Sequence, residues 1–68
     1  MTRNEKEAKF RNRIAAAEVE LEHWKDALRR HQAAGDRNQA ELDRVFLNST
    51  LEELQVLNDN YLRFLLAE

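Results

Sequence analysis

The sequence contains no cysteine, no proline and a single glycine. Without cysteine, the chain has neither a disulfide nor a thiolate metal site. Without proline, every residue can donate a helical backbone hydrogen bond, and Gly35 is the one strong helix breaker. The N-terminus opens no apolar signal segment, and no uncharged apolar run approaches the ~18–20 residues that span a bilayer. These absences predict an all-α protein that is soluble and cytoplasmic and has no membrane partner.

The chain is also short, with 68 residues, of which 35% are charged. Ordering such a chain costs about 1.5 kcal/mol per residue, and a core of this size barely offsets that cost. Disulfides and thiolate metal sites are excluded, so association with a second chain is the remaining means of stabilisation. We therefore expect one domain, residues 1–68, that forms a homodimer.

Apolar residues recur at alternating spacings of three and four in the first half of the chain. This spacing is typical of a coiled-coil heptad. Thr2 and Glu5 have the spacing of a capping box, which favours a helix beginning at residue 3. The sequence predicts a helix over about residues 3–34 whose apolar stripe packs against another helix. The stripe consists of Phe10, Ile14, Ala17, Leu21, Trp24 and Leu28.

Gly35 and Asp36 mark a turn at the middle of the chain. Glycine just past a helix end can adopt the left-handed conformation, and Asp36 can cap a following helix. A turn here predicts an antiparallel helical hairpin in which the two halves lie side by side. Apolar residues then meet at several levels: Leu28 with Leu42, Trp24 with Phe46, Ile14 with Leu57, and Phe10 with Tyr61.

The apolar pattern of the second half is less regular than that of the first. Leu42 and Phe46 define one stripe, and Leu54 and Leu57 define another that is out of phase by about one residue. Residues 49–53 lie between them and contain two capping-box spacings. The sequence therefore predicts either one kinked helix or two helices, over about residues 37–47 and 50–67.

The C-terminal segment carries more apolar residues than one neighbouring helix can cover. A second hairpin related by two-fold symmetry is the simplest cover and would make a homodimeric four-helix bundle, and the alternative is that this surface is kept for a different protein. Asn58 either fixes the register of such a bundle or lies at the edge of the stripe in water. The candidate partner-binding residues are Tyr61, Leu62, Arg63, Phe64 and Leu66.

No spacing in the sequence predicts a catalytic or metal site. Glu20 and His23 match half of the di-iron motif of helical bundles, but the other half is missing and the pair lies off the heptad stripe. His31 continues the stripe towards the turn. Ser49 and Thr50 have the positions of helix caps. We therefore expect a protein that is not an enzyme, with no cofactor and no small-molecule substrate.

The first turns of the chain are basic, which makes nucleic acid the alternative partner. A net charge of −2 argues against it, because nucleic-acid modules usually carry a domain-wide positive charge. The candidate phosphate contacts are Arg3, Lys6, Lys9 and Arg13.

The stripe from Phe10 to Leu28, the turn at Gly35 and Asp36, and the apolar C-terminal helix together resemble compact helical-hairpin regulators. In architecture, the chain is similar to very small phage-encoded proteins that bind and inhibit a host regulatory protein, of the quorum-sensing anti-activator type. It is also similar to the plasmid copy-number hairpin dimers that bind RNA. The first resemblance implies a non-enzymatic inhibitor and the second an RNA-binding dimer. A structural coiled-coil oligomerisation element is the third alternative.

Overall fold

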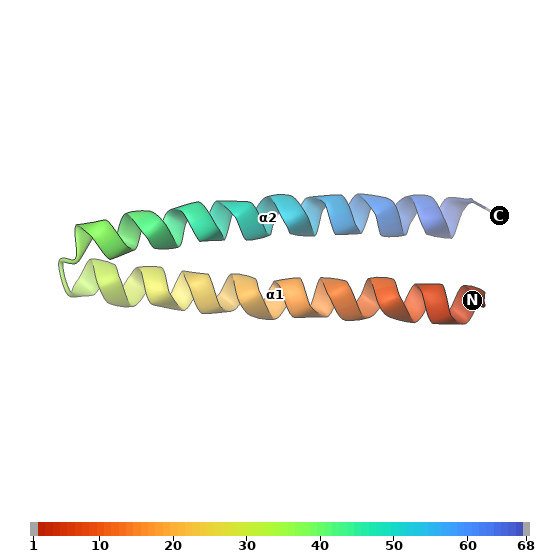
Figure 1. Cartoon of the computed structure of the whole chain (residues 1–68), viewed down its shortest axis with the longest axis horizontal. Helices are drawn as coiled ribbons and strands as arrows, with labels where there is room; N and C mark the ends of the chain where they lie inside the picture. The colour runs from red at the N-terminus through yellow and green to blue at the C-terminus, as the bar shows by residue number, and fades with distance from the viewer. Residues whose placement is uncertain (1, 68) are drawn as a thin grey trace.

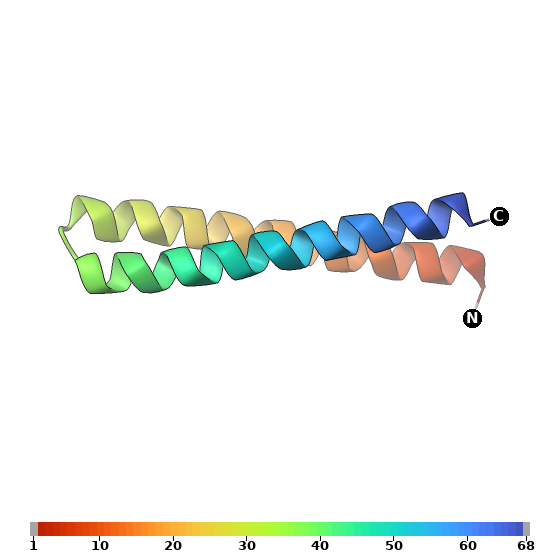
Figure 2. The same cartoon turned by 90° about the horizontal axis from the view of Figure 1, so that it is seen from above.

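The protein folds as a helical hairpin in a computed structural model that describes residues 2–67. Helix α1 (Arg3–Ala33) and helix α2 (Arg37–Leu66) lie antiparallel, so both chain ends are at the same end of the molecule (Figure 1). Seen from above, the two helices cross at a shallow angle, as the helices of a coiled coil do (Figure 2). The predicted all-α antiparallel hairpin is confirmed.

The predicted helix ends are confirmed by their hydrogen bonds. The Thr2 hydroxyl accepts from the Glu5 amide at 3.2 Å, and the Asp36 carboxylate accepts from the Gln39 amide at 3.2 Å. Gly35 has a φ of 73°, in the left-handed region that glycine adopts without strain. The Asp36 amide then reaches back to the His31 carbonyl at 2.9 Å, which completes a Schellman-type helix end. The turn is therefore fixed by local chemistry.

The apolar stripe of α1 faces α2 along the whole hairpin. Ala17 and Leu21 are buried, and the remaining predicted stripe residues are half-buried. Ala27 is also buried, although it lies beside the stripe. The sequence-based assignment of the α1 seam is confirmed.

Of the two alternatives predicted near residue 49, the break into two helices is wrong, because α2 is one continuous helix. Neither Figure 1 nor Figure 2 shows a sharp bend in it. The residues of α2 that face α1 keep alternating spacings of three and four without interruption. Three of them are small or polar, so an apolar pattern alone does not reveal this seam. Its members are Ala40, Asp43, Leu47, Thr50, Leu54, Leu57, Tyr61 and Phe64.

Leu42 and Phe46, which the sequence placed in the seam, lie outside it with 49% and 47% of their surface exposed. The true register puts Asp43 and Leu47 against α1 instead. Phe46 still stacks on Trp24 at the edge of the seam, so this predicted level of the hairpin is confirmed. Leu54 and Leu57 are half-buried on the seam, as predicted.

Thr50 is a buried seam residue and not a helix cap. Only 3% of its surface is exposed, and its hydroxyl donates to the Phe46 carbonyl at 2.9 Å, one turn earlier in the same helix. This bond satisfies the hydroxyl without interrupting the backbone ladder.

Thr50→Val is expected to leave the stability unchanged or to raise it slightly. The substitution replaces a buried hydroxyl by a methyl group of similar size, and the Phe46 carbonyl keeps its helical hydrogen bond. A cap at this position would instead lose about 1 kcal/mol on substitution. Urea unfolding at fixed protein concentration distinguishes the two outcomes, and a loss of that size would contradict the continuous helix.

A single hairpin leaves much of its surface in water. The chain exposes 5325 Å², whereas a compact monomer of 8.1 kDa exposes about 4,500 Å². The radius of gyration is 15.5 Å, against about 11 Å for a compact chain of this length. No side chain among residues 2–67 is fully buried. The fold therefore has a seam and no enclosed core.

Candidate interaction surfaces

An aromatic and polar cluster closes the open end of the hairpin. The Phe10 ring lies 5.6 Å from the Tyr61 ring and 5.3 Å from the Phe64 ring, between centroids. The Tyr61 hydroxyl donates to Glu7 at 3.0 Å and accepts from Arg11 Nε at 3.2 Å. Tyr61 and Phe64 were predicted to contact a partner, but the structure uses them to join α2 to α1.

Arg11 and Glu7 form an ion pair within this cluster. Arg11 Nη2 lies 2.8 Å from Glu7 Oε1. The hydrogen bond to Tyr61 and the negative charge of Glu7 raise the pKa of Arg11 above its ordinary value. Sequence reasoning missed this triad, because Glu7 and Tyr61 are separated by 54 positions. The pairing of the two halves about Gly35 was the one signal that pointed to it.

Exposed leucines on the last turns of α2 form what we call the terminal surface. Leu62 and Leu66, both predicted partner-binding residues, have 54% and 75% of their surface exposed. Leu65 lies beside them, and Arg63, also predicted, is exposed and pairs with Asp59 at 3.1 Å. Leu51 lies further along the same side of the helix. The terminal surface is defined as Leu51, Leu62, Leu65 and Leu66.

A second patch, the aromatic surface, lies nearer the turn and consists of the exposed Leu42, Val45 and Phe46 together with the half-buried Trp24. Its centre is the Trp24–Phe46 stack, whose ring centroids are 4.7 Å apart. The His23 and Trp24 rings meet edge to face with their centroids 4.9 Å apart, and Trp24 Nε1 donates to Glu20 Oε1 at 3.5 Å. Glu20 and His23 therefore surround an aromatic side chain, and no group of three potential metal ligands exists within residues 2–67.

The two surfaces lie on opposite flanks of the α2 seam. With Ala40 at position a of the heptad, Phe46 falls at g, whereas Leu51 and Leu65 fall at e. These positions border the seam from its two sides. A single protein bound to one flank would leave the other exposed, so the two surfaces can have different occupants.

Basic side chains gather beside Phe10 at the open end. One shallow groove is lined by Lys6, Lys9 and Arg13 together with Phe10, and none of the three basic residues forms an ion pair within the described chain. Arg3, the fourth predicted phosphate contact, lies over the Phe64 ring, 4.9 Å from its centroid. Three of the four candidates therefore share a groove, and the fourth lies against α2.

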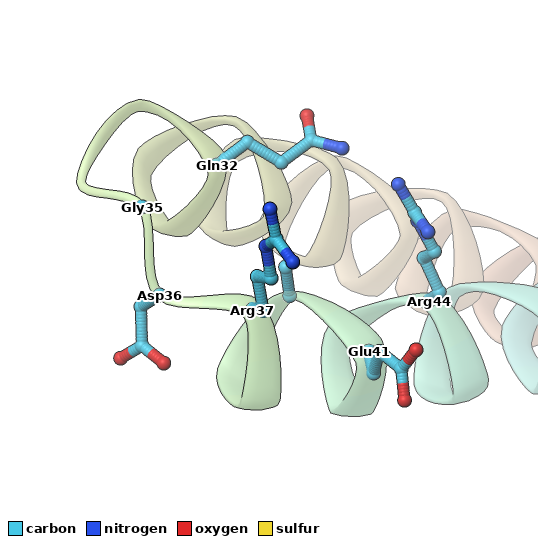
Figure 3. A pocket seen from close by; sticks show the side chains of 7 residues that line it. Gln32, Gly35, Asp36, Arg37, Glu41 and Arg44 are labelled. Carbon is cyan, nitrogen blue, oxygen red and sulfur yellow. The ribbon is translucent and has the colours of Figure 1, made fainter.

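A polar groove runs beside the turn (Figure 3). The side chains of Arg37 and Arg44 extend towards the side of Gln32, whereas Asp36 and Glu41 point away from it. Neither arginine has an ion-pair partner in the described part of the chain. The groove is open to water, and its charged lining residues are two arginines, one aspartate and one glutamate.

No protein-family model, curated protein or solved structure matches the chain. Within residues 2–67, neither helix combines the length and the apolar character needed to cross a bilayer. We therefore infer function from the surfaces of the hairpin.

Proposed function

We propose that the chain is a small, non-enzymatic regulatory protein that binds another protein through the terminal surface and blocks it. The observation that carries this proposal is the exposed set Leu62, Leu65 and Leu66, which has the i, i+3, i+4 spacing of a helix that docks in a groove. The fitting partner has an apolar groove with a polar rim, because Arg63 and Asp59 border the leucines.

Contacts at the open end of the hairpin hold the helical turns that carry these leucines against α1. The Phe10, Tyr61 and Phe64 rings fix the opposite side of the same helical turns, and the Tyr61 hydroxyl is held by Glu7 and Arg11. A preorganised helix loses less conformational freedom on binding than a flexible segment does. The seam therefore supports binding although its residues do not touch the partner.

The double substitution Leu62→Asp/Leu66→Asp is expected to abolish capture of a stoichiometric protein partner from a lysate of the cells that make the chain. Each exposed leucine at such an interface contributes about 1–2 kcal/mol, so losing both weakens binding by about a hundredfold with the purified partner. Titration calorimetry then measures the affinity.

Val19→Asp is the matched control, because Val19 is exposed on α1 and lies outside both apolar surfaces. It should capture the same protein as the unmodified chain. Equal capture by the control and the double variant, or no stoichiometric partner at all, would contradict the proposal.

A second candidate is phosphate binding by the groove of Lys6, Lys9 and Arg13, which is favoured by their shared position and unpaired charge. A gel shift with RNA and duplex DNA tests this function, because binding to phosphates weakens steeply as salt rises. No shift at low salt excludes it.

A further inference from the structure

We infer that the aromatic surface is covered by a second copy of this chain, in an antiparallel arrangement with two-fold symmetry. This inference goes beyond the proposed function, because it concerns the flank of α2 opposite to the terminal surface. It commits Trp24, Leu42, Val45 and Phe46 to a homodimer interface. Three independent observations support it.

The first observation is the chemistry of the patch. The Trp24 and Phe46 rings stack on each other with an interplanar angle of 16° at the edge of the seam. About half of the surface of Leu42 and Phe46 is in water, and Val45 is more exposed still. Large aromatic side chains at a surface are the residues that contribute most to protein interfaces. An apolar patch centred on them is suited to burial.

The second observation is area. The hairpin exposes about 800 Å² more than a compact monomer of the same mass. A stable protein–protein interface of standard size buries about 800 Å² on each partner. Association of two hairpins would bury an area of this size on each chain. It would also enclose side chains that a single hairpin leaves partly in water.

The third observation is the arrangement of charge about Trp24. Glu20 lies four residues before Trp24, about 6 Å towards the open end, and Arg30 lies six residues after it, about 9 Å towards the turn. With Ile14 at position a of the α1 heptad, Glu20 falls at g and Arg30 at c, on the flank of α1 that carries the Trp24–Phe46 stack. Within residues 2–67, the Arg30 side chain has one ion pair, with Asp26 at 3.2 Å, and this exposed pair stabilises little.

A two-fold axis perpendicular to the hairpin at the level of Trp24 therefore places Arg30 of each copy near Glu20 of the other. The patch is self-complementary in charge as well as apolar at its centre, as an isologous interface requires. A parallel pairing of the same flanks would instead bring like charges together. The antiparallel second copy is the occupant that the surface fits.

Dilution of the unmodified protein tests the inference, because Trp24 is the only tryptophan and lies in the proposed interface. Molar mass should fall from twice 8.1 kDa to 8.1 kDa, and the Trp24 emission should shift to longer wavelength with the same midpoint. A mass of 8.1 kDa at every concentration overturns the inference. A fall in mass with no change in emission also overturns it, because the dimer would then use another surface.

Matched variants locate the interface. Phe46→Glu should raise the dimer dissociation constant by at least about a hundredfold, whereas Leu62→Glu on the other flank should leave it unchanged. Both residues lie outside the hairpin seam. A dimer that survives Phe46→Glu, or one that Leu62→Glu dissociates, contradicts the assignment.

Charge reversal tests the symmetry without removing apolar surface, and it remains informative if Phe46→Glu fails to fold. Arg30→Glu and Glu20→Arg should each weaken the dimer by about tenfold, and the two together should restore it. If the loss of dimerisation free energy in the double variant equals the sum of the losses in the two single variants, the two-fold arrangement is overturned. Target capture by the Leu62→Asp/Leu66→Asp variant is a separate readout, so each proposal can fail alone.

Discussion

Leu21→Asp is expected to abolish the folded hairpin. Leu21 is 9% exposed and occupies the middle of the seam between α1 and α2. The substitution removes about 2 kcal/mol of apolar burial and places a charged carboxylate between the two helices, where it loses much of its hydration. A chain of this length has a total stability of about 3–10 kcal/mol, so the combined loss is large enough to unfold it.

Circular dichroism at 222 nm during heating measures the effect, and Val19→Asp is the control. The two positions are two residues apart on the same helix, but Val19 is 72% exposed on the outer face. We expect Val19→Asp to melt like the unmodified protein and Leu21→Asp to show little helix at any temperature. A cooperative melt of Leu21→Asp at the original midpoint would contradict the seam.

His31→Ala is expected to cost about 1–3 kcal/mol, the penalty for leaving a buried polar group without a hydrogen-bond partner. Asp43 lies in the α2 seam with 3% of its surface exposed, and its Oδ2 is 2.5 Å from His31 Nδ1. The loss of His31 leaves this carboxylate buried between the helices. Urea unfolding at fixed protein concentration measures the change.

The double variant His31→Leu/Asp43→Leu is expected to be at least as stable as the unmodified protein. Replacing both members of a buried pair by apolar residues is often neutral or stabilising, whereas removing one member is not. The double variant must therefore be more stable than His31→Ala. If the double variant is instead less stable than His31→Ala, the pair contributes net stability and the seam tolerates no apolar residue at these positions.

The first helix and the turn were predictable from sequence because their signals are local. The α1 stripe is formed by apolar residues, and the caps at Thr2 and Asp36 depend on residues three positions away. Gly35 is needed because the helix end requires a positive φ. Each feature is specified by a few neighbouring residues, and the structure confirms it.

The second helix was predicted less well because its seam is not an apolar stripe. Ala40, Asp43 and Thr50 face α1, whereas Leu42 and Phe46 face outwards. Asp43 is tolerated in the seam by His31, and Thr50 by a backbone carbonyl of its own helix. Tertiary contacts therefore override the hydrophobic pattern, and a prediction that follows apolar residues alone places Leu42 and Phe46 in the seam and allows for a break that the helix does not have.

The candidate surfaces were predicted in part. The exposed positions of Leu62, Arg63 and Leu66 follow from the excess of apolar residues near the C-terminus, which the sequence shows. The inward position of Tyr61 and Phe64 depends on their contacts with Phe10, which are long-range. Composition identifies a surplus of apolar residues, and the register of the helix pair decides which of them remain exposed.

The register of α2 is the central claim, because it determines which side chains are free for a second copy and for a target. Nuclear Overhauser contacts from the Phe10 and Trp24 rings, recorded on labelled chains diluted with unlabelled protein, test it most directly. We predict contacts from Phe10 to Tyr61 and Phe64, and from Trp24 to Phe46. Contacts from Phe10 to Leu62 would contradict the register and both proposals.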